Sequence, residues 1–277
     1  MADIAIPRRL PGLGPVLATQ IRYQLTMILR TPRALIAGLL LPGALLALER
    51  GNAQQHITMA LAAPKVAGLV SFSAVAIAFF THANALVIAR EDGVLRRWHA
   101  APLPTWGCFA ARITATTLLT VASGLILVLV AMQMAGLHLS GRAIPGLLAV
   151  GVLGALALSA TATLITAIIP STQAAQPVLM LIYIPLIILS GSLGSLATEL
   201  PHWLTRTITY LPVQPIIDSA TRVLEHPGGT IMSVHDLAVL AGWAAGAMLF
   251  SLRFFRWDPT RQRHARPRTN GSTGRSE

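Results

Sequence analysis

Long runs of apolar residues without any charge fill most of the chain, and short clusters of arginine separate them. A helix needs about 20 such residues to cross a bilayer core about 30 Å thick. The longest run, residues 143–198, exceeds one span, and the polar turn at 170–173 divides it in two. The pattern therefore predicts an all-α polytopic membrane protein with six transmembrane helices in a domain over residues 34–252. The predicted spans are residues 34–48, 66–89, 113–135, 143–169, 177–193 and 237–252.

The segment before the first span predicts a cytoplasmic N-terminus, residues 1–33, that ends in an amphipathic interfacial helix over 15–33. Its apolar face consists of Leu17, Ile21, Leu25 and Ile28, and its polar face of Arg22, Thr26, Arg30 and Arg33. Such a helix lies at the membrane surface, with its arginines at anionic headgroups. An ordinary lead-in to the first span is the alternative. A signal peptide fits poorly, because a basic region of over thirty residues comes first and more spans follow.

The loop between spans five and six is apolar and rich in proline, unlike a hydrophilic linker. Proline-broken apolar helices outside the predicted spans are typical of re-entrant or interfacial segments. We expect such an outer segment over residues 196–218, with Trp203 and Tyr210 at the headgroup level. Pro212, Pro215 and Asp218 belong to the same segment.

Charge sets the orientation. Sixteen basic residues lie before the first span, between spans two and three, or after the last span, and five lie on the opposite side. Because positive charge is retained in the cytoplasm, both termini are predicted to be cytoplasmic. The basic tail, residues 253–277, is expected to be disordered and drawn to anionic lipid rather than to nucleic acid.

Composition narrows the classes of function. The chain has 277 residues, of which 54% are hydrophobic and only 11% charged, and a formal net charge of +11. These values exclude a disordered chain and disfavour a soluble globule. Cys108 is the only cysteine, so neither an intramolecular disulfide nor a cysteine-based zinc site can form.

Motifs of enzymes and of self-energised pumps are absent from the sequence. There is no Walker A phosphate loop, no His-Glu-x-x-His zinc motif and no Gly-x-Ser-x-Gly elbow. The predicted spans hold no Asp, Glu, Lys or Arg, which disfavours a proton-driven transporter. We therefore expect no enzymatic activity, metal or cofactor in this chain. His82 and Asn84, polar side chains within span two, are candidates for a substrate path, whereas the serines and threonines of the spans are expected to pack helices.

The cytoplasmic loop over residues 90–104 is the best candidate for docking a partner. It contains the only adjacent acid pair in the chain, two arginines, a tryptophan and two prolines. The candidate contact residues are Arg90, Glu91, Asp92, Gly93, Leu95, Arg96, Arg97 and Trp98. A solvated loop that only satisfies the positive-inside rule is the alternative.

Two motifs in this order resemble the ABC type-2 permease family. Residues 90–97 followed by Ala101-Pro102-Leu103-Pro104 are similar to its Arg-Glu-x-Gly-x-Leu-x-Arg…Thr-Pro coupling segment, with Ala101 in place of Thr. Residues 189–191, 200–204 and 211–218 are similar to its outer re-entrant region, with Val213-Gln214-Pro215 after Leu-Pro where Thr-Tyr is usual.

This resemblance implies a permease of the bacterial cell membrane that pairs with a second permease copy and with a separate cytoplasmic ABC ATPase. ATP and Mg²⁺ would then bind to the partner ATPase and not to this chain. The implied substrates are drugs, antibiotics, lipids or polysaccharides, and the actinobacterial daunorubicin-resistance exporters are the subgroup it resembles most. An ATP-independent channel or carrier and a structural membrane assembly protein remain open, and an ATPase partner would discriminate among the three.

Overall fold

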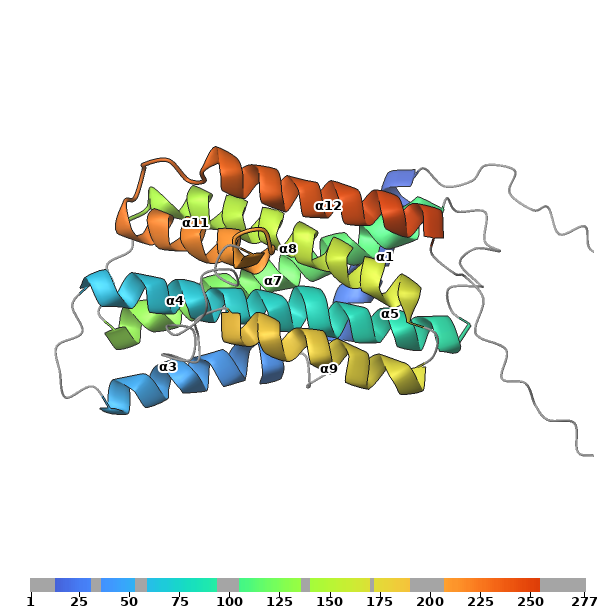
Figure 1. The fold of residues 1–277 in the computed structure, drawn as a ribbon, viewed down its shortest axis with the longest axis horizontal. Coiled ribbons are helices and arrows are strands. Elements are labelled where there is room, and N and C mark those ends of the chain that lie inside the picture. The colour runs from blue at the N-terminus through green and yellow to red at the C-terminus, as the bar shows by residue number, and fades with distance from the viewer. Residues whose placement is uncertain are drawn as a thin grey trace, which may run out of the picture.

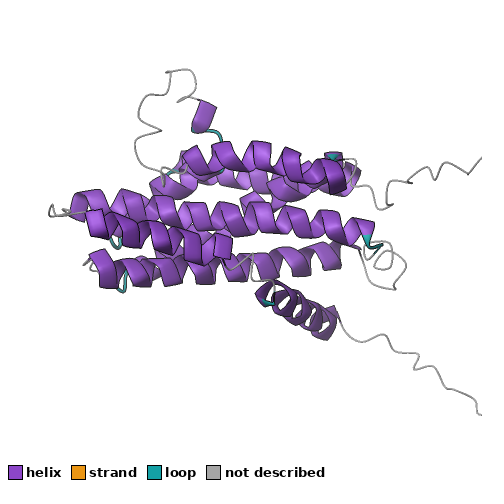
Figure 2. Ribbon diagram, turned by 90° about the horizontal axis from the view of Figure 1, so that it is seen from below, coloured by secondary structure: helices purple, strands orange, loops and turns teal. Residues whose placement is uncertain are grey.

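Nearly parallel helices form one elongated bundle in the computed structural model (Figure 1). The structure describes residues 13–30, 36–52, 59–93, 105–135, 140–169, 172–189 and 207–254, and every regular element within these ranges is helical (Figure 2). The elements are α1 (Leu13–Leu29), η1 (Ile36–Leu40), α3 (Leu41–Asn52), α4 (Met59–Ala74), η2 (Val75–Thr81), α5 (His82–Glu91), α7 (Thr105–Ala135), α8 (Ala143–Ile168), α9 (Thr172–Leu189), α11 (Val213–Glu225) and α12 (Val234–Phe254). The elements η1 and η2 are π-helical and run directly into their α-helical neighbours.

Four helices are long and apolar enough to cross a membrane: Ala63–Glu91, Phe109–Met134, Ala143–Ala167 and Val234–Ser251. The apolar stretches Gly38–Leu48 and Gln173–Leu189 are shorter. Helices thus occupy all six predicted regions, and among the residues that the structure describes four of them have the length of a span. The continuous helix α4–η2–α5 is the centre of the bundle, since 83% of its apolar window is buried against 22% for α12.

Two helices continue past the predicted span boundaries. We expected span two to end at residue 89 and span three to begin at 113, because Arg90 and Arg112 stand there. Instead both arginines lie inside continuous helices and are buried, with exposed fractions of 4% and 7%. The candidate spans Ala63–Glu91 and Phe109–Met134 therefore include Arg90 and Arg112, which the predicted ranges leave out.

The bundle has two ends. The helices α5, α8 and α12 end where α7 and α9 begin, and the expected interfacial helix α1 lies at this same end, packed on α7 (Figure 1). The expectation of a helix over 15–33 is met by Leu13–Leu29. We call this end the Glu91 end, and the opposite end, where α11 leads into α12, the Asp236 end.

The short helix α11 lies within the length of the bundle, beside α4 and α8 (Figure 1). Glycines on α8 allow this close approach. A Cβ at Gly154 would lie 2.7 Å from Cδ1 of Ile216, and one at Gly146 would lie 2.9 Å from Cγ1 of Val223. The two glycines are eight residues apart, so they share one face of α8.

Candidate functional site

The last turn of α5 is joined to the end of α8 by Arg90. Its guanidinium donates to the carbonyl oxygen of Thr166 over 3.1 Å and to that of Ile169 over 2.8 Å. The last carbonyls of a helix lack intrahelical partners and carry partial negative charge, so a buried arginine is well matched to them. Arg90, which we expected to face a partner, therefore points into the bundle.

The acidic pair follows directly at the surface. Glu91 and Asp92 are exposed, and Gly93 adopts φ +64°, a left-handed conformation that ends the helix. Both acids make further interactions, so neither is free. The other predicted docking residues, Leu95, Arg96, Arg97 and Trp98, lie outside the described residues. The docking role of this loop stays a prediction.

His82 joins three helices. Its Nδ1 lies 3.1 Å from Oγ1 of Thr116 on α7, and its Nε2 lies 3.2 Å from Oγ1 of Thr163 on α8. The side chain is only 2% exposed. His82 and Arg90 are eight residues apart on α5, so both fasten the same face of this helix to α8.

The His82 junction has few hydrogen-bond donors for its acceptors. The hydroxyl of Thr116 donates to the carbonyl of Arg112, and that of Thr163 donates to the carbonyl of Ser159. A neutral imidazole has one N–H donor and one acceptor. One of the two threonines must therefore turn its hydroxyl from the backbone toward His82 for both ring nitrogens to be satisfied.

The side chain of Asn84 hydrogen-bonds within its own continuous helix. Its Nδ2 donates to the carbonyl of Phe80 over 3.0 Å, and the Phe80 ring stacks on Tyr183 of α9 with 4.6 Å between centroids. The geometry of His82 and Asn84 favours helix packing over lining a substrate path. Their role in a path remains a prediction.

A second polar junction joins η1 and α4 to α7, as expected for serines within the spans. The hydroxyl of Ser123 donates to the carbonyl of Gly38 over 2.9 Å and lies 2.9 Å from the hydroxyl of Ser73. Ile77 of η2 occupies the space that a Cβ on Gly38 would need. π-helical turns of this kind are often found at functional sites.

The outer segment lies against α12. The indole nitrogen of Trp243 donates to the carbonyl of Tyr210 over 2.7 Å, and the Tyr210 ring lies edge-on to His235, with 5.7 Å between centroids. Pro212 immediately precedes α11 and Pro215 lies in its first turn, where proline is tolerated because the N–H groups have no helical partner. Trp203 lies outside the described residues.

The Asp236 end is held by a carboxylate. Asp236, 5% exposed, accepts a hydrogen bond from Arg222 over 3.3 Å and one from Ser219 over 3.4 Å, both on α11. Asp236 and Ser233 also bond each other's backbone N–H, a capping box that starts α12. Tyr210, before α11, bonds to Trp243 in the middle of α12, whereas Ser219, within α11, bonds to Asp236 in the first turn of α12. The two helices therefore run antiparallel.

Asp218 lies on α11 near this junction. Gln214 donates to its Oδ1 over 2.9 Å, one helical turn away. Partial burial raises the pKa of the Asp218 carboxyl above its ordinary value.

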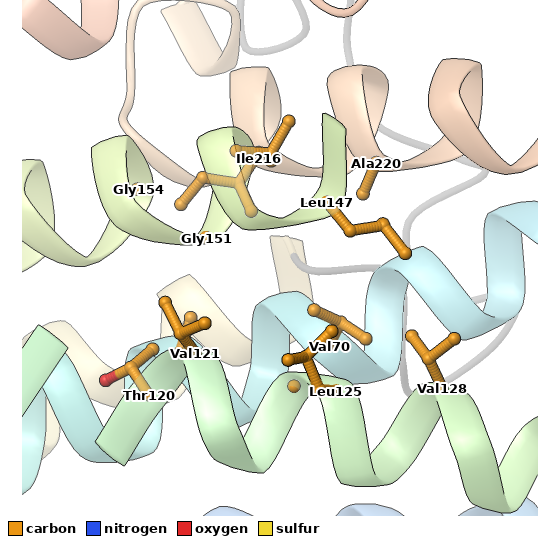
Figure 3. A pocket seen from close by; sticks show the side chains of 13 residues that line it. Val70, Thr120, Val121, Leu125, Val128, Leu147, Gly151, Gly154, Ile216 and Ala220 are labelled. Carbon is orange, nitrogen blue, oxygen red and sulfur yellow. The ribbon is translucent and has the colours of Figure 1, made fainter. Parts of the chain in front are cut away.

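A cavity of about 30 Å³ lies between α4, α7, α8 and α11. Its labelled lining is apolar apart from Thr120 (Figure 3). Of the lining glycines of α8, Gly154 packs directly against Ile216 and Gly151 against Val121. This volume matches one water molecule, whereas sites for drug-sized ligands take about 300–1,000 Å³.

Comparison with known families gives one match. The model of the family described as ABC-2 type transporter matches residues 17–224, which include η1, the helix α4–η2–α5, and almost all of α11. A search of curated proteins finds no match.

Proposed function

This chain belongs to the ABC-2 type transporter family, and we propose that it is the permease subunit of an ATP-driven exporter. Members of the family are non-catalytic, multi-pass membrane subunits that generally pair with an ABC ATPase. The match over residues 17–224 is the observation that carries this proposal. Export is its direction, and ATP with Mg²⁺ binds to the partner.

The ATPase docks on the loop over residues 90–104. Support comes from Arg90, which links the first residue of this loop to the end of α8. Since His82, at the start of α5, links this helix to α7 and α8, a displacement of the loop moves three helices together. Leu95 and Trp98 supply most of the docking affinity, because exposed charge pairs contribute little.

Three measurements test this coupling: capture of the ATPase by the tagged permease, hydrolysis by the complex, and efflux from cells. Glu91→Ala should leave the permease inserted and lower efflux far more than it lowers ATPase capture. Leu95→Ala combined with Trp98→Ala should release the ATPase. Full efflux by both variants would reduce the loop to a topological anchor.

Two copies of the permease form the substrate path between them. The cavity of about 30 Å³ between α4, α7, α8 and α11 has room for about one water molecule, which is too little for the expected drug-like, antibiotic or lipid substrate. The daunorubicin-resistance exporters are the subgroup proposed, and both termini lie in the cytoplasm. Cross-linking of single cysteines on copies with different tags tests the pairing.

The outer segment before α12 enters the membrane from the outer side. The position of α11 beside α4, α8 and α12 supports this, as does the bond between Trp243 and Tyr210. Trp243 stands nine residues after the start of α12, which corresponds to about 14 Å along a helix.

Co-purification decides among the remaining classes. A tagged chain expressed in its native host should retain a subunit with a Walker A motif. An ATP-independent carrier would retain none and would transport after ATP depletion, and a structural protein would transport under neither condition.

A further inference from the structure

We propose that Arg112 binds a phosphate group at the Glu91 end of the bundle, carried by a lipid headgroup or free in solution. The first observation is burial. Arg112 lies on α7 and is 7% exposed, three residues into the candidate span Phe109–Met134. A charged side chain within a transmembrane helix is costly unless it is paired, so an arginine at this position needs an anion.

The second observation is that no anion within the described part of the chain meets this need. Salt bridges there involve Asp236, which pairs with Arg222 at the opposite end of the bundle. Only the backbone carbonyl of Arg112 takes part in a described hydrogen bond, as acceptor from Thr116. Its electrostatic neighbour is His82, which cannot compensate a positive charge.

The third observation is that the guanidinium can still be reached. Among the described residues, three side-chain hydroxyls are fully buried and have no hydrogen-bond partner, those of Ser71, Thr117 and Ser159. No nitrogen of Arg112 is among them, although its guanidinium has no described acceptor either. The guanidinium is therefore not fully sealed from the surface of the bundle.

Depth and geometry point to phosphate. Arg112 follows Phe109 by three residues, which is about 4.5 Å along the helix and close to the level of lipid headgroups. A planar guanidinium donates two parallel hydrogen bonds to a phosphate. The guanidinium of Arg90 at the same end already donates to carbonyl oxygens of α8. Arg112 is therefore the arginine that we propose for binding the phosphate.

The test uses the purified, delipidated full chain in a neutral maltoside detergent and three probes. These are dioleoylphosphatidylglycerol, dioleoylglycerol with the same chains but no phosphate, and inorganic phosphate. Binding is measured by native mass spectrometry and by the shift of the thermal unfolding midpoint. Phosphatidylglycerol should bind and raise the midpoint, and dioleoylglycerol should not.

Arg112→Gln should weaken phosphatidylglycerol binding at least about tenfold. Arg253→Gln, which removes an exposed arginine at the same end, should leave it unchanged. If Arg112→Gln does not fold, Arg112→Lys should still bind several-fold more weakly than the wild type, because an ammonium cannot form the paired bonds.

The source of the phosphate follows from competition. Displacement of the lipid by millimolar inorganic phosphate assigns a free phosphate ligand, and no displacement assigns a headgroup. Equal phosphatidylglycerol affinity in the wild type and both Arg112 variants would overturn the proposal, as would equal binding of dioleoylglycerol.

Discussion

The guanidinium of Arg90 donates to the carbonyl oxygen of Ile169 over 2.8 Å, so the last turn of one buried helix closes the end of another. Ile169 is the residue at which α8 stops, with an extended backbone conformation. The exposed pair Glu91 and Asp92 follows Arg90 directly. A force applied to the loop is therefore transmitted to α8 without passing through the length of a helix.

Replacement of Arg90 should weaken both stability and coupling. Arg90→Ala leaves two buried carbonyls without donors and should lower the free energy of unfolding by about 2–3 kcal/mol. Arg90→Lys should recover part of this loss, because an ammonium cannot hold both carbonyls in the same geometry. Chemical unfolding in detergent measures the loss, and Arg253→Ala is the matched control at the same end. An Arg90→Ala protein with wild-type stability would contradict the clamp.

Replacement of His82 should cost stability without changing which substrates are exported. In His82→Leu the hydroxyls of Thr116 and Thr163 keep their own backbone acceptors, so we expect a loss of only about 1 kcal/mol. Unfolding and efflux of several substrates should be measured together, with Asn84→Ala alongside. Altered substrate preference at unchanged stability would instead place His82 in a substrate path.

Gly154→Ala should force α11 away from α8. The new Cβ would lie 2.7 Å from Cδ1 of Ile216, and overpacking of this kind costs about 1–3 kcal/mol. Ile216→Val in the same chain should restore part of the stability by shortening the opposing side chain. Gly242→Ala on α12 has open space at its Cβ and should be neutral or slightly stabilising. Equal effects of the two glycine substitutions would refute the close approach.

Protonation of Asp218 should stabilise the folded protein as the pH falls. Because its pKa in the folded protein lies above the ordinary value of 3.8, the folded state favours the protonated carboxyl. Stability from this group is present at low pH and is lost as the pH rises through the folded pKa. Asp218→Asn should therefore be more stable than the wild type at pH 7, and this difference should shrink as the pH falls toward 3.8. A difference that does not depend on pH would show that Asp218 does not titrate in this way.

Cysteines in the outer segment should react slowly with a bulky water-soluble thiol reagent. In a chain carrying Cys108→Ser, Tyr210→Cys is expected to be shielded by lipid, because its side chain is exposed on the bundle and the proposed outer segment enters the membrane. Thr230→Cys, in the exposed loop before α12, should react fast in intact cells or in inverted vesicles. Equally fast labelling at both positions would mean that the segment extends into water.

The sequence located the helices because charge-free runs mark membrane spans, but the helices continue past the predicted ends where a charge is buried. Arg90 stays inside the bundle because carbonyls of α8 accept its hydrogen bonds, and these carbonyls are 76 and 79 residues away in the chain. A rule that ends a span at a charged residue cannot anticipate such distant partners.

The candidate site was predictable only in part for the same reason. His82 stood out as a polar residue within a span, yet its partners lie 34 and 81 residues away. Nothing local indicates that Thr116 faces inward while Thr114 is exposed. The pairing of α11 with α12 was missed too, although Ser233 and Asp236 form the Ser-x-x-acid spacing of a capping box.

The π-helical segment before His82 should let the chain tolerate the deletion of one residue. Each i→i+5 closure encloses one residue more than the i→i+4 closure of an α-helix. Val75–Thr81 can therefore give up one residue by becoming α-helical, while the helices on either side keep their orientation. Elsewhere in the same span, a deletion would rotate all later side chains by about 100° and turn His82 away from Thr116. Homologues that are one residue shorter should carry the gap within 75–81.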